Sequence, residues 1–197
     1  NEVARSFDRG VNYFDVAPQY GDAQENMGPA IEPYRDNLFL ACKTLKRDVA
    51  GAREQLEDSL KKLRTDHFDL YQLHAMTTEA DFEEATGPGG ALEAFVRAKD
   101  EGLIRHIGFS AHSAQIACKL LDTFPFDSTL FPINFVTMLE EGFGPQVVEK
   151  AEEKGASILA LKGMALRLYE ENEEKKYNRC WYVPIEDREL ASIALRY

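Results

Sequence analysis

The chain has 197 residues, of which 44% are hydrophobic and 29% are charged, a composition typical of soluble globular proteins. Asp and Glu outnumber Lys and Arg by 34 to 23, and the net charge of −11 argues against nucleic acid or an anionic membrane surface as the main partner. No apolar run approaches the roughly 20 residues of a membrane span, so no membrane partner is expected. Cys42, Cys118 and Cys180 are odd in number and far apart, which favours free thiols in a reducing compartment and a cytoplasmic location.

Runs rich in β-formers alternate with amphipathic helical patterns along the chain. Strands are expected at residues 11–16, 37–43, 67–73, 104–110, 129–135 and 156–162. Helices are expected between them at residues 48–64, 90–102, 112–124 and 145–155. Residues 77–90 are expected to form an acidic surface loop. This alternation predicts parallel strands joined by right-handed βαβ crossovers.

Two α/β architectures fit this pattern, an open doubly wound sheet and a (β/α)8 barrel. An open sheet that binds a dinucleotide usually carries GxGxxG after its first strand, and the sequence has no such motif. The GPGG at residues 87–90 lies between a loop and a helix, which is the wrong context. In both architectures the functional residues lie at the carboxyl ends of the strands.

Three successive expected strands end in polar residues that suit one chemistry. Asp15 and Tyr20 follow the first strand, Lys43 the second and His74 the third. A carboxylate in an apolar run needs a partner, and Lys43 on the neighbouring strand is the expected one. An ammonium near Tyr20 stabilises the phenolate and makes the phenol a better proton donor, while His74 can hydrogen-bond a substrate oxygen. The set suits reduction of a carbonyl with hydride from a cofactor.

Four segments resemble motifs of the aldo-keto reductase family, in the right order and spacing. They are DVAPQYGDAQENMG (15–28), ACKT (41–44), DLYQLHAM (69–76) and GLIRHIGFSAHS (102–113). The resemblance runs from about residue 3 to about residue 165 and implies a (β/α)8 TIM barrel, here a single domain over residues 1–197. It also implies binding of NADPH or NADH without a Rossmann motif. Tyr20 is then the catalytic acid/base, and Asp15, Lys43 and His74 complete a catalytic tetrad.

The resemblance further implies positions for cofactor-binding residues. In the family, residues after the fifth barrel strand and on the sixth hold the nicotinamide carboxamide, and Ser110 and Asn134 match those places. The six visible strands then correspond to barrel strands two to seven. Two roles stay open for His112, beside a helix start or in the pocket lining, and we place it with the cofactor-binding candidates. Lys162, with the backbone of Gly163 beside it, is the candidate for the cofactor's pyrophosphate.

The leading functional hypothesis is an NAD(P)(H)-dependent oxidoreductase that reduces a small aldehyde or ketone to an alcohol. One alternative is a regulatory nucleotide-binding protein on the same barrel that turns over poorly. A second alternative is a metal-dependent hydrolase, although the four histidines lack ligand spacing and no metal site is expected. The sequence does not indicate the substrate, the choice between NADPH and NADH, or the oligomeric state.

Six βα units cannot close a barrel of eight strands. The sequence-based expectation is therefore one more strand before Asn1 and one after Tyr197, with much of the adenosine site on the latter.

Overall fold

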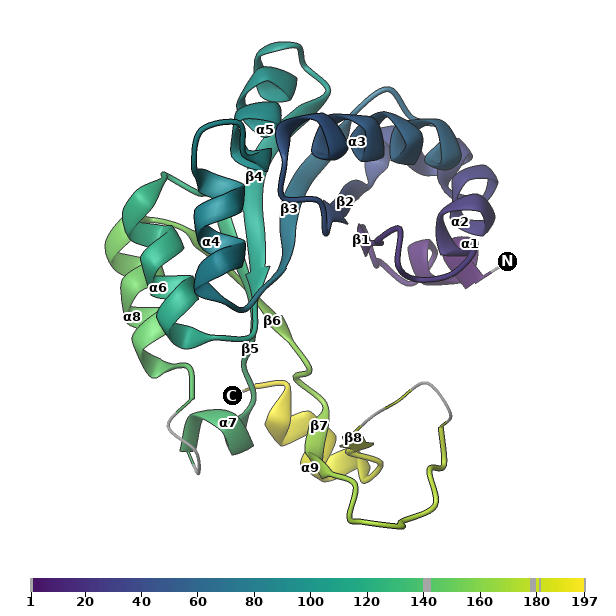
Figure 1. The fold of residues 1–197 in the computed structure, drawn as a ribbon. Coiled ribbons are helices and arrows are strands. Elements are labelled where there is room, and N and C mark those ends of the chain that lie inside the picture. The colour runs from purple at the N-terminus through teal and green to yellow at the C-terminus, as the bar shows by residue number, and fades with distance from the viewer. Residues whose placement is uncertain (1, 140–142, 178–179, 181, 197) are drawn as a thin grey trace.

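The computed structural model describes residues 2–139, 143–177, 180 and 182–196. A curved sheet of six strands forms its centre, and every strand runs parallel to its neighbours (Figure 1). The strands are β1 Tyr13–Asp15, β2 Phe39–Thr44, β3 Phe68–Met76, β4 Ile104–Ala111, β5 Ser128–Pro132 and β6 Ser157–Leu161.

The order of the strands decides between the two expected architectures. They lie side by side in chain order from β1 to β6 without a reversal. A doubly wound sheet reverses its strand order at a switch point, whereas a barrel adds each strand on the same side of the last. The predicted α/β class and all six predicted strands are confirmed, and the sheet is an arc of a (β/α)8 barrel.

Helices cover the outer face of this arc (Figure 1). The helices that follow strands in this layer are α2 Ala23–Ile31, α3 Val49–Leu63, α5 Ala91–Asp100, α6 Ala114–Thr123 and α8 Pro145–Lys154. Helix α3 begins where the Asp48 carboxylate accepts a hydrogen bond from the Gly51 amide at 2.8 Å, and it ends at Arg64 in the left-handed conformation. Among the helices of the described residues, none is long and apolar enough to cross a membrane.

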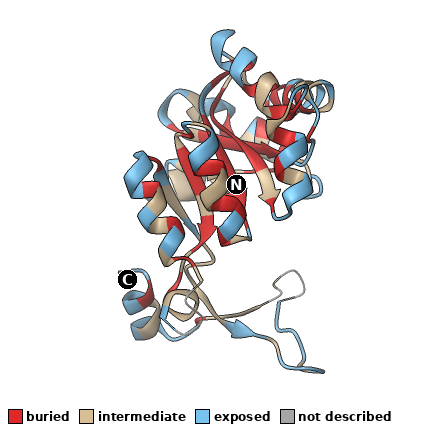
Figure 2. Ribbon diagram, turned by 60° about the vertical axis from the view of Figure 1, so that its left-hand side comes forward, coloured by how far each residue is buried: buried red, intermediate tan, exposed pale blue. Residues whose placement is uncertain are grey.

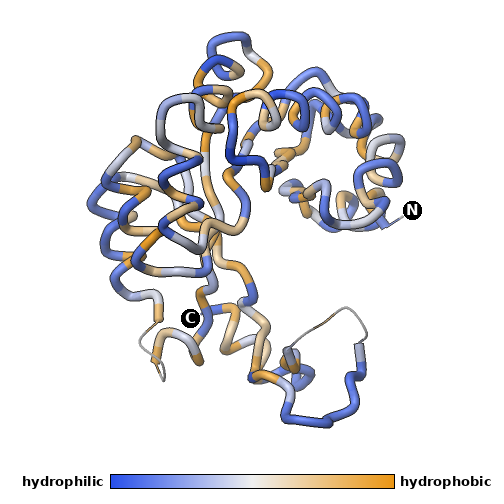
Figure 3. Tube along the Cα trace, viewed as in Figure 1, coloured by the Kyte–Doolittle hydropathy of each residue, from blue (hydrophilic) through white to orange (hydrophobic). Residues whose placement is uncertain are grey.

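Burial on both faces explains why the strands are nearly continuous apolar runs. Figure 2 shows most of the sheet buried beneath the helices, and Figure 3 shows apolar residues concentrated along the strands. Side chains alternate along each strand, so Leu40 and Phe109 pack in the core under the helices while Lys43 and Ser110 lie on the opposite, inner face. The inner face is where polar groups gather.

Two expectations about the connections are wrong. The predicted loop at 77–90 contains helix α4 (Glu79–Thr86), which begins with a reciprocal capping box between Thr78 and Asp81. The predicted strand at 129–135 ends at Pro132, because Asn134 caps the short helix α7 (Phe135–Leu139) instead of extending the strand.

Other elements flank the arc. They are α1 Glu2–Phe7, the 3-10 helix η1 Glu32–Asn37, and, beyond β6, the antiparallel hairpin β7 Ala165–Leu168 and β8 Tyr182–Pro184 with α9 Arg188–Ala194. Figure 2 shows the hairpin mostly at intermediate or full exposure, unlike the sheet.

Gly28 marks a close approach between two helices. A Cβ atom at this position would lie 2.3 Å from the carbonyl oxygen of Lys62 and 3.1 Å from the Cα of Leu63. We expect Gly28→Ala to lower the free energy of unfolding by about 1–3 kcal/mol, because α2 must move away from α3. Chemical denaturation measures this loss, with the exposed Asn26→Ala on the same helix as control. A Gly28→Ala protein as stable as its control would show that the helices are not in backbone contact.

Candidate functional site

The four predicted catalytic residues meet on the inner face at the carboxyl ends of β1, β2 and β3. Lys43 Nζ donates a hydrogen bond to Asp15 Oδ1, and the lysine side chain is only 1% exposed. The same ammonium lies 5.4 Å from the centre of the Tyr20 ring. The His74 ring meets the Tyr20 ring edge-on, with 6.1 Å between the centroids. The predicted Asp15–Lys43 pair is confirmed, and the tyrosine and histidine lie against it.

Burial and nearby positive charges keep His74 neutral at pH 7. Burial lowers the pKa of His74 to about 4, and the positive charges of Lys43, Arg47 and His112 act in the same direction. A neutral imidazole can donate one N–H to a substrate oxygen without taking up a proton first.

Two glutamines complete the geometry, and sequence reasoning missed both. Gln72 Nε2 donates to the second oxygen of Asp15 at 3.2 Å, and the amide oxygen Oε1 of Gln19 lies 3.2 Å from Nδ1 of His74. With Oε1 at this position Nδ1 carries the imidazole proton, and rotating the Gln19 amide so that its NH₂ group faces Nδ1 moves the proton to Nε2, where a ligand can accept it. A signal for Gln72 existed: it lies two residues before His74 on one strand, and period-two alternation puts both on one face.

The four catalytic candidates line a cavity of about 380 Å³. Its wall is formed by Tyr13, Asp15, Tyr20, Lys43, His74, Ser110, His112, Leu130, Ala160, Leu161 and Lys162. The hydroxyl of Tyr13 is buried here without a hydrogen-bond partner among the described atoms, and burial raises the pKa of this phenol so that it stays protonated.

Three of the five predicted cofactor-binding residues reach this cavity. Ser110 is buried, and its Oγ accepts a hydrogen bond from the Ala75 amide at 2.8 Å. His112 Nδ1 and Lys162 Nζ lie 3.4 Å apart. Burial lowers the pKa of Lys162 to about 8, and burial together with the Lys162 charge lowers the pKa of His112.

The other two predicted residues lie just outside it. Asn134 lines an adjoining cavity of about 530 Å³ that shares His112 and Lys162 with the first. Its amide is engaged within the protein, because Nδ2 donates to the carbonyl oxygen of Lys162 at 3.3 Å and Oδ1 accepts from the Thr137 amide at 3.1 Å. A Cβ atom at Gly163 would meet nothing within 4 Å, so packing does not require glycine there.

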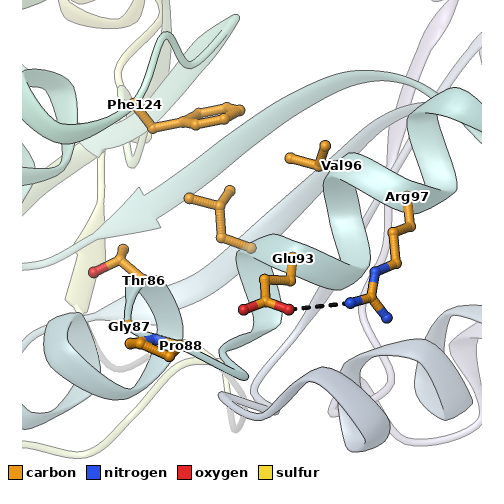
Figure 4. A pocket seen from close by; sticks show the side chains of 8 residues that line it. Thr86, Gly87, Pro88, Glu93, Val96, Arg97 and Phe124 are labelled. Carbon is orange, nitrogen blue, oxygen red and sulfur yellow. Dashed lines mark hydrogen bonds and ion pairs between the residues drawn. The ribbon is translucent and has the colours of Figure 1, made fainter.

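A third hollow lies on the outer surface, between α5 and the ends of α4 and α6 (Figure 4). It has a volume of about 510 Å³, and its polar contact is a surface ion pair between Arg97 and Glu93 at 3.2 Å. Leu92, Val96 and Phe124 supply an apolar wall. Its carboxylate and its guanidinium are paired with each other, and neither a phenol nor an imidazole is among its lining residues, so the candidate site is the cavity at the strand ends. Within the described ranges, no three His, Cys, Asp or Glu side chains are grouped to hold a metal ion.

Comparison with known proteins identifies the family. The family model described as "Aldo/keto reductase family" matches residues 2–180, which is most of the chain. The chain belongs to the aldo/keto reductase family.

This chain spans only part of the length of its relatives in the aldo/keto reductase family. The aldo-keto reductase YhdN of Bacillus subtilis is 36% identical over 136 residues, covering 62% of this chain and 38% of that protein. The NAD/NADP-dependent indole-3-acetaldehyde reductase of Schizosaccharomyces pombe is 30% identical over 155 residues, covering 77% of this chain and 50% of that protein. A solved structure of a putative aldo-keto reductase from Pseudomonas aeruginosa superposes with a TM-score of 0.72 at 25% identity, covering 83% of this chain and 66% of that one.

Proposed function

We propose that the protein is a nicotinamide-dependent oxidoreductase that reduces a small aldehyde or ketone to the alcohol. The observation that carries the proposal is the meeting of Asp15, Tyr20, Lys43 and His74, from three strands, in one cavity. A buried ion pair alone would stabilise the barrel rim. A phenol over that pair, beside a neutral imidazole, adds a proton donor and an oxygen-binding group.

Each residue has a distinct task in this proposal. When bound, the reduced nicotinamide supplies the hydride to the carbonyl carbon. His74 donates its N–H to the carbonyl oxygen, and Tyr20 gives that oxygen a proton as negative charge develops on it. The Lys43 ammonium stabilises the phenolate left behind, Asp15 holds Lys43 in place, and the phenolate recovers its proton from solvent.

The two adjoining cavities have side chains that fit a nicotinamide nucleotide. Lys162 and His112 lie where the cavities meet, and Arg167 and Thr137 line the larger one. Among the described residues, the walls of the larger cavity contain no Asp or Glu, although the whole chain carries a charge of −11. The Lys162 ammonium suits a phosphate oxygen, whereas the Arg167 guanidinium is paired with Glu173 at 2.7 Å.

The substrate class follows from the size and lining of the catalytic cavity. Its volume of about 380 Å³ suits a small molecule, and Leu130, Ala160 and Leu161 provide apolar contacts. The fission yeast relative is named for an aldehyde and for both nicotinamide nucleotides, which supports testing aldehydes with NADPH and NADH.

Steady-state oxidation of NADPH and NADH by the intact protein, with a panel of aliphatic and aromatic aldehydes and ketones, tests the proposal. We expect carbonyl-dependent loss of absorbance from at least one reduced nucleotide. Tight nucleotide binding without turnover on any carbonyl would instead favour the regulatory nucleotide-binding alternative.

Lys162 provides a prediction for the nucleotide site. Below its pKa of about 8 the ammonium is charged and attracts phosphate, and above it the charge is lost. We therefore expect nucleotide affinity to weaken as the pH rises from 7 to 9. Lys162→Met should reduce affinity at pH 7 by about tenfold, the worth of one partly exposed charge-assisted hydrogen bond.

Calorimetric titration of NADPH across this pH range measures both effects. Lys99→Met is the matched control, because Lys99 pairs with Asp127 at 3.2 Å on the protein surface. If the nucleotide affinity of Lys162→Met depends on pH in the same way as that of the control, Lys162 does not bind the nucleotide.

A further inference from the structure

The backbone that carries His74 departs from regular strand geometry. The register of β3 against β4 shifts between Leu73 and Met76, so His74 and Ala75 form a bulge in the ladder. Ala75 has a φ of 54°, in the left-handed region that a residue with a Cβ rarely adopts. Such a conformation persists only where surrounding contacts hold it.

Side chains from two other segments hold the peptide group between His74 and Ala75. Arg47 Nη2 donates to the carbonyl oxygen of His74 at 2.8 Å, and Ser110 Oγ accepts from the amide of Ala75 at 2.8 Å. Arg47 Nη2 also lies 3.5 Å from the carbonyl oxygen of Ala75. Both polar ends of this peptide unit are therefore bonded outside the β ladder, and the direction of the His74 side chain depends on those bonds.

The Arg47 side chain is itself held in place by Asp81 on helix α4. Its side chain is only 8% exposed, and Nε donates to Asp81 Oδ1 at 2.9 Å. Asp81 also accepts from the amide and hydroxyl of Thr78 at the start of α4, and α4 packs against β3 and α5. The carbonyl oxygen of Arg47 accepts from the Ala91 amide at 2.6 Å. A guanidinium that is buried, paired and hydrogen-bonded holds one position, which a surface arginine does not.

We propose that Arg47, held by Asp81, is a positioning residue for the proposed reductase: its guanidinium fixes the His74–Ala75 peptide and so aims the His74 imidazole at the substrate oxygen. The inference rests on the proposed role of His74 and goes beyond it by assigning a function to α4. The short acidic helix keeps Arg47 in place rather than contacting the substrate.

The charged and titratable groups that face His74 come from several segments. They are Tyr20 after β1, Lys43 on β2, Arg47 after β2 and His112 after β4. Burial is the largest cause of the lowered pKa of His74, and the Lys43, Arg47 and His112 charges add to it. Removing the Arg47 charge and opening the site to water both favour the imidazolium, so the pKa of His74 should rise.

The test measures catalysis and the His74 titration in the same variants of the intact protein. For Arg47→Met we expect kcat to fall about 10- to 100-fold with little change in KM, as for a misaligned catalytic group. The His74 ring signals, assigned by their loss in His74→Gln, should titrate about one pH unit higher than in the wild type. For Arg47→Lys, which keeps the charge without the planar donor pair, we expect the wild-type titration with a lowered kcat. Arg53→Met is the matched control, because Arg53 pairs with Glu57 and Glu101 on the outer surface of α3.

The outcomes separate this inference from the proposed function. Wild-type kcat and wild-type titration in Arg47→Met would overturn the inference while leaving the reductase intact, and wild-type kcat in Arg47→Lys would overturn the positioning role. If the wild type reduces no carbonyl, only the titration of His74 tests the inference. A rise of about one unit in the His74 pKa in Arg47→Met supports the effect of the Arg47 contact on His74, and an unchanged pKa overturns that effect. If Arg47→Met fails to fold, Arg47→Lys and Asp81→Asn are judged on kcat, where reduction supports the inference and wild-type values overturn it.

Discussion

Replacing Tyr20 with phenylalanine is expected to lower kcat by about 10²–10⁴-fold while leaving nucleotide affinity nearly unchanged. The hydroxyl acts only as negative charge develops on the substrate oxygen, so its interaction is made in the transition state and not in the nucleotide complex. The ring stays, and with it the packing over Lys43 and against His74. Steady-state kinetics and calorimetric nucleotide binding, measured on the same preparation, separate the two effects.

The matched control is Tyr34→Phe, which removes a hydroxyl from a ring that packs on Phe7, outside the catalytic cavity. It should retain the wild-type kcat. Wild-type turnover in Tyr20→Phe as well would show that another group gives the proton.

Replacing Lys43 with methionine is expected to lower kcat at pH 7 by about 10²-fold or more, in the range of a lost acid–base group. The alkaline limit of the activity that remains should move to higher pH, because without the ammonium the phenolate of Tyr20 is less stable and the proton-donating phenol persists. Asp15→Asn should shift activity in the same direction by less, since Asp15 acts through Lys43. The pH dependence of kcat/KM in the three proteins measures the shift.

Stability must be measured beside activity in these variants. Asp15 is 24% exposed and keeps its bond to Gln72, so Lys43→Met should cost less than the ~3–5 kcal/mol of a fully buried pair. Lys61→Met, at an exposed position of α3, is the control for loss of one lysine. A pH–rate profile in Lys43→Met that matches this control would disprove the coupling between the ammonium and the phenol.

The meeting of the four candidate catalytic residues was predictable, because each one follows from a local sequence pattern. Strand-forming runs that end in Asp15, Lys43 and His74 place these side chains at one edge of any parallel sheet, whatever its overall architecture. Composition did not decide between barrel and open sheet, because both have the same local alternation of strands and helices. The resemblance implied the barrel, and the strand order from β1 to β6 confirmed it.

The contacts that sequence reasoning missed join residues that are far apart in the sequence and meet only in the folded structure. Arg47 and Asp81 are 34 residues apart, and nothing in the local sequence of either one indicates the other. Helix α4 had a readable signal in its capping box at Thr78 and Asp81, but its acidic composition led to the prediction of a loop. Asn134 was assigned to a strand because the neighbouring apolar residues continue the pattern, whereas its side chain caps α7.

The most direct test of the proposed function follows deuterium from reduced nucleotide to product. The intact protein is mixed with NADPH deuterated at the reactive nicotinamide carbon and with the best carbonyl of the panel, and the product is identified by mass spectrometry. We predict one alcohol formed for each nucleotide oxidised, with deuterium on the former carbonyl carbon in the wild type and a rate reduced by about 10²–10⁴-fold in Tyr20→Phe. Nucleotide that binds in the cavity but yields no deuterated alcohol with any carbonyl would contradict the proposal that these four residues form a reductase site.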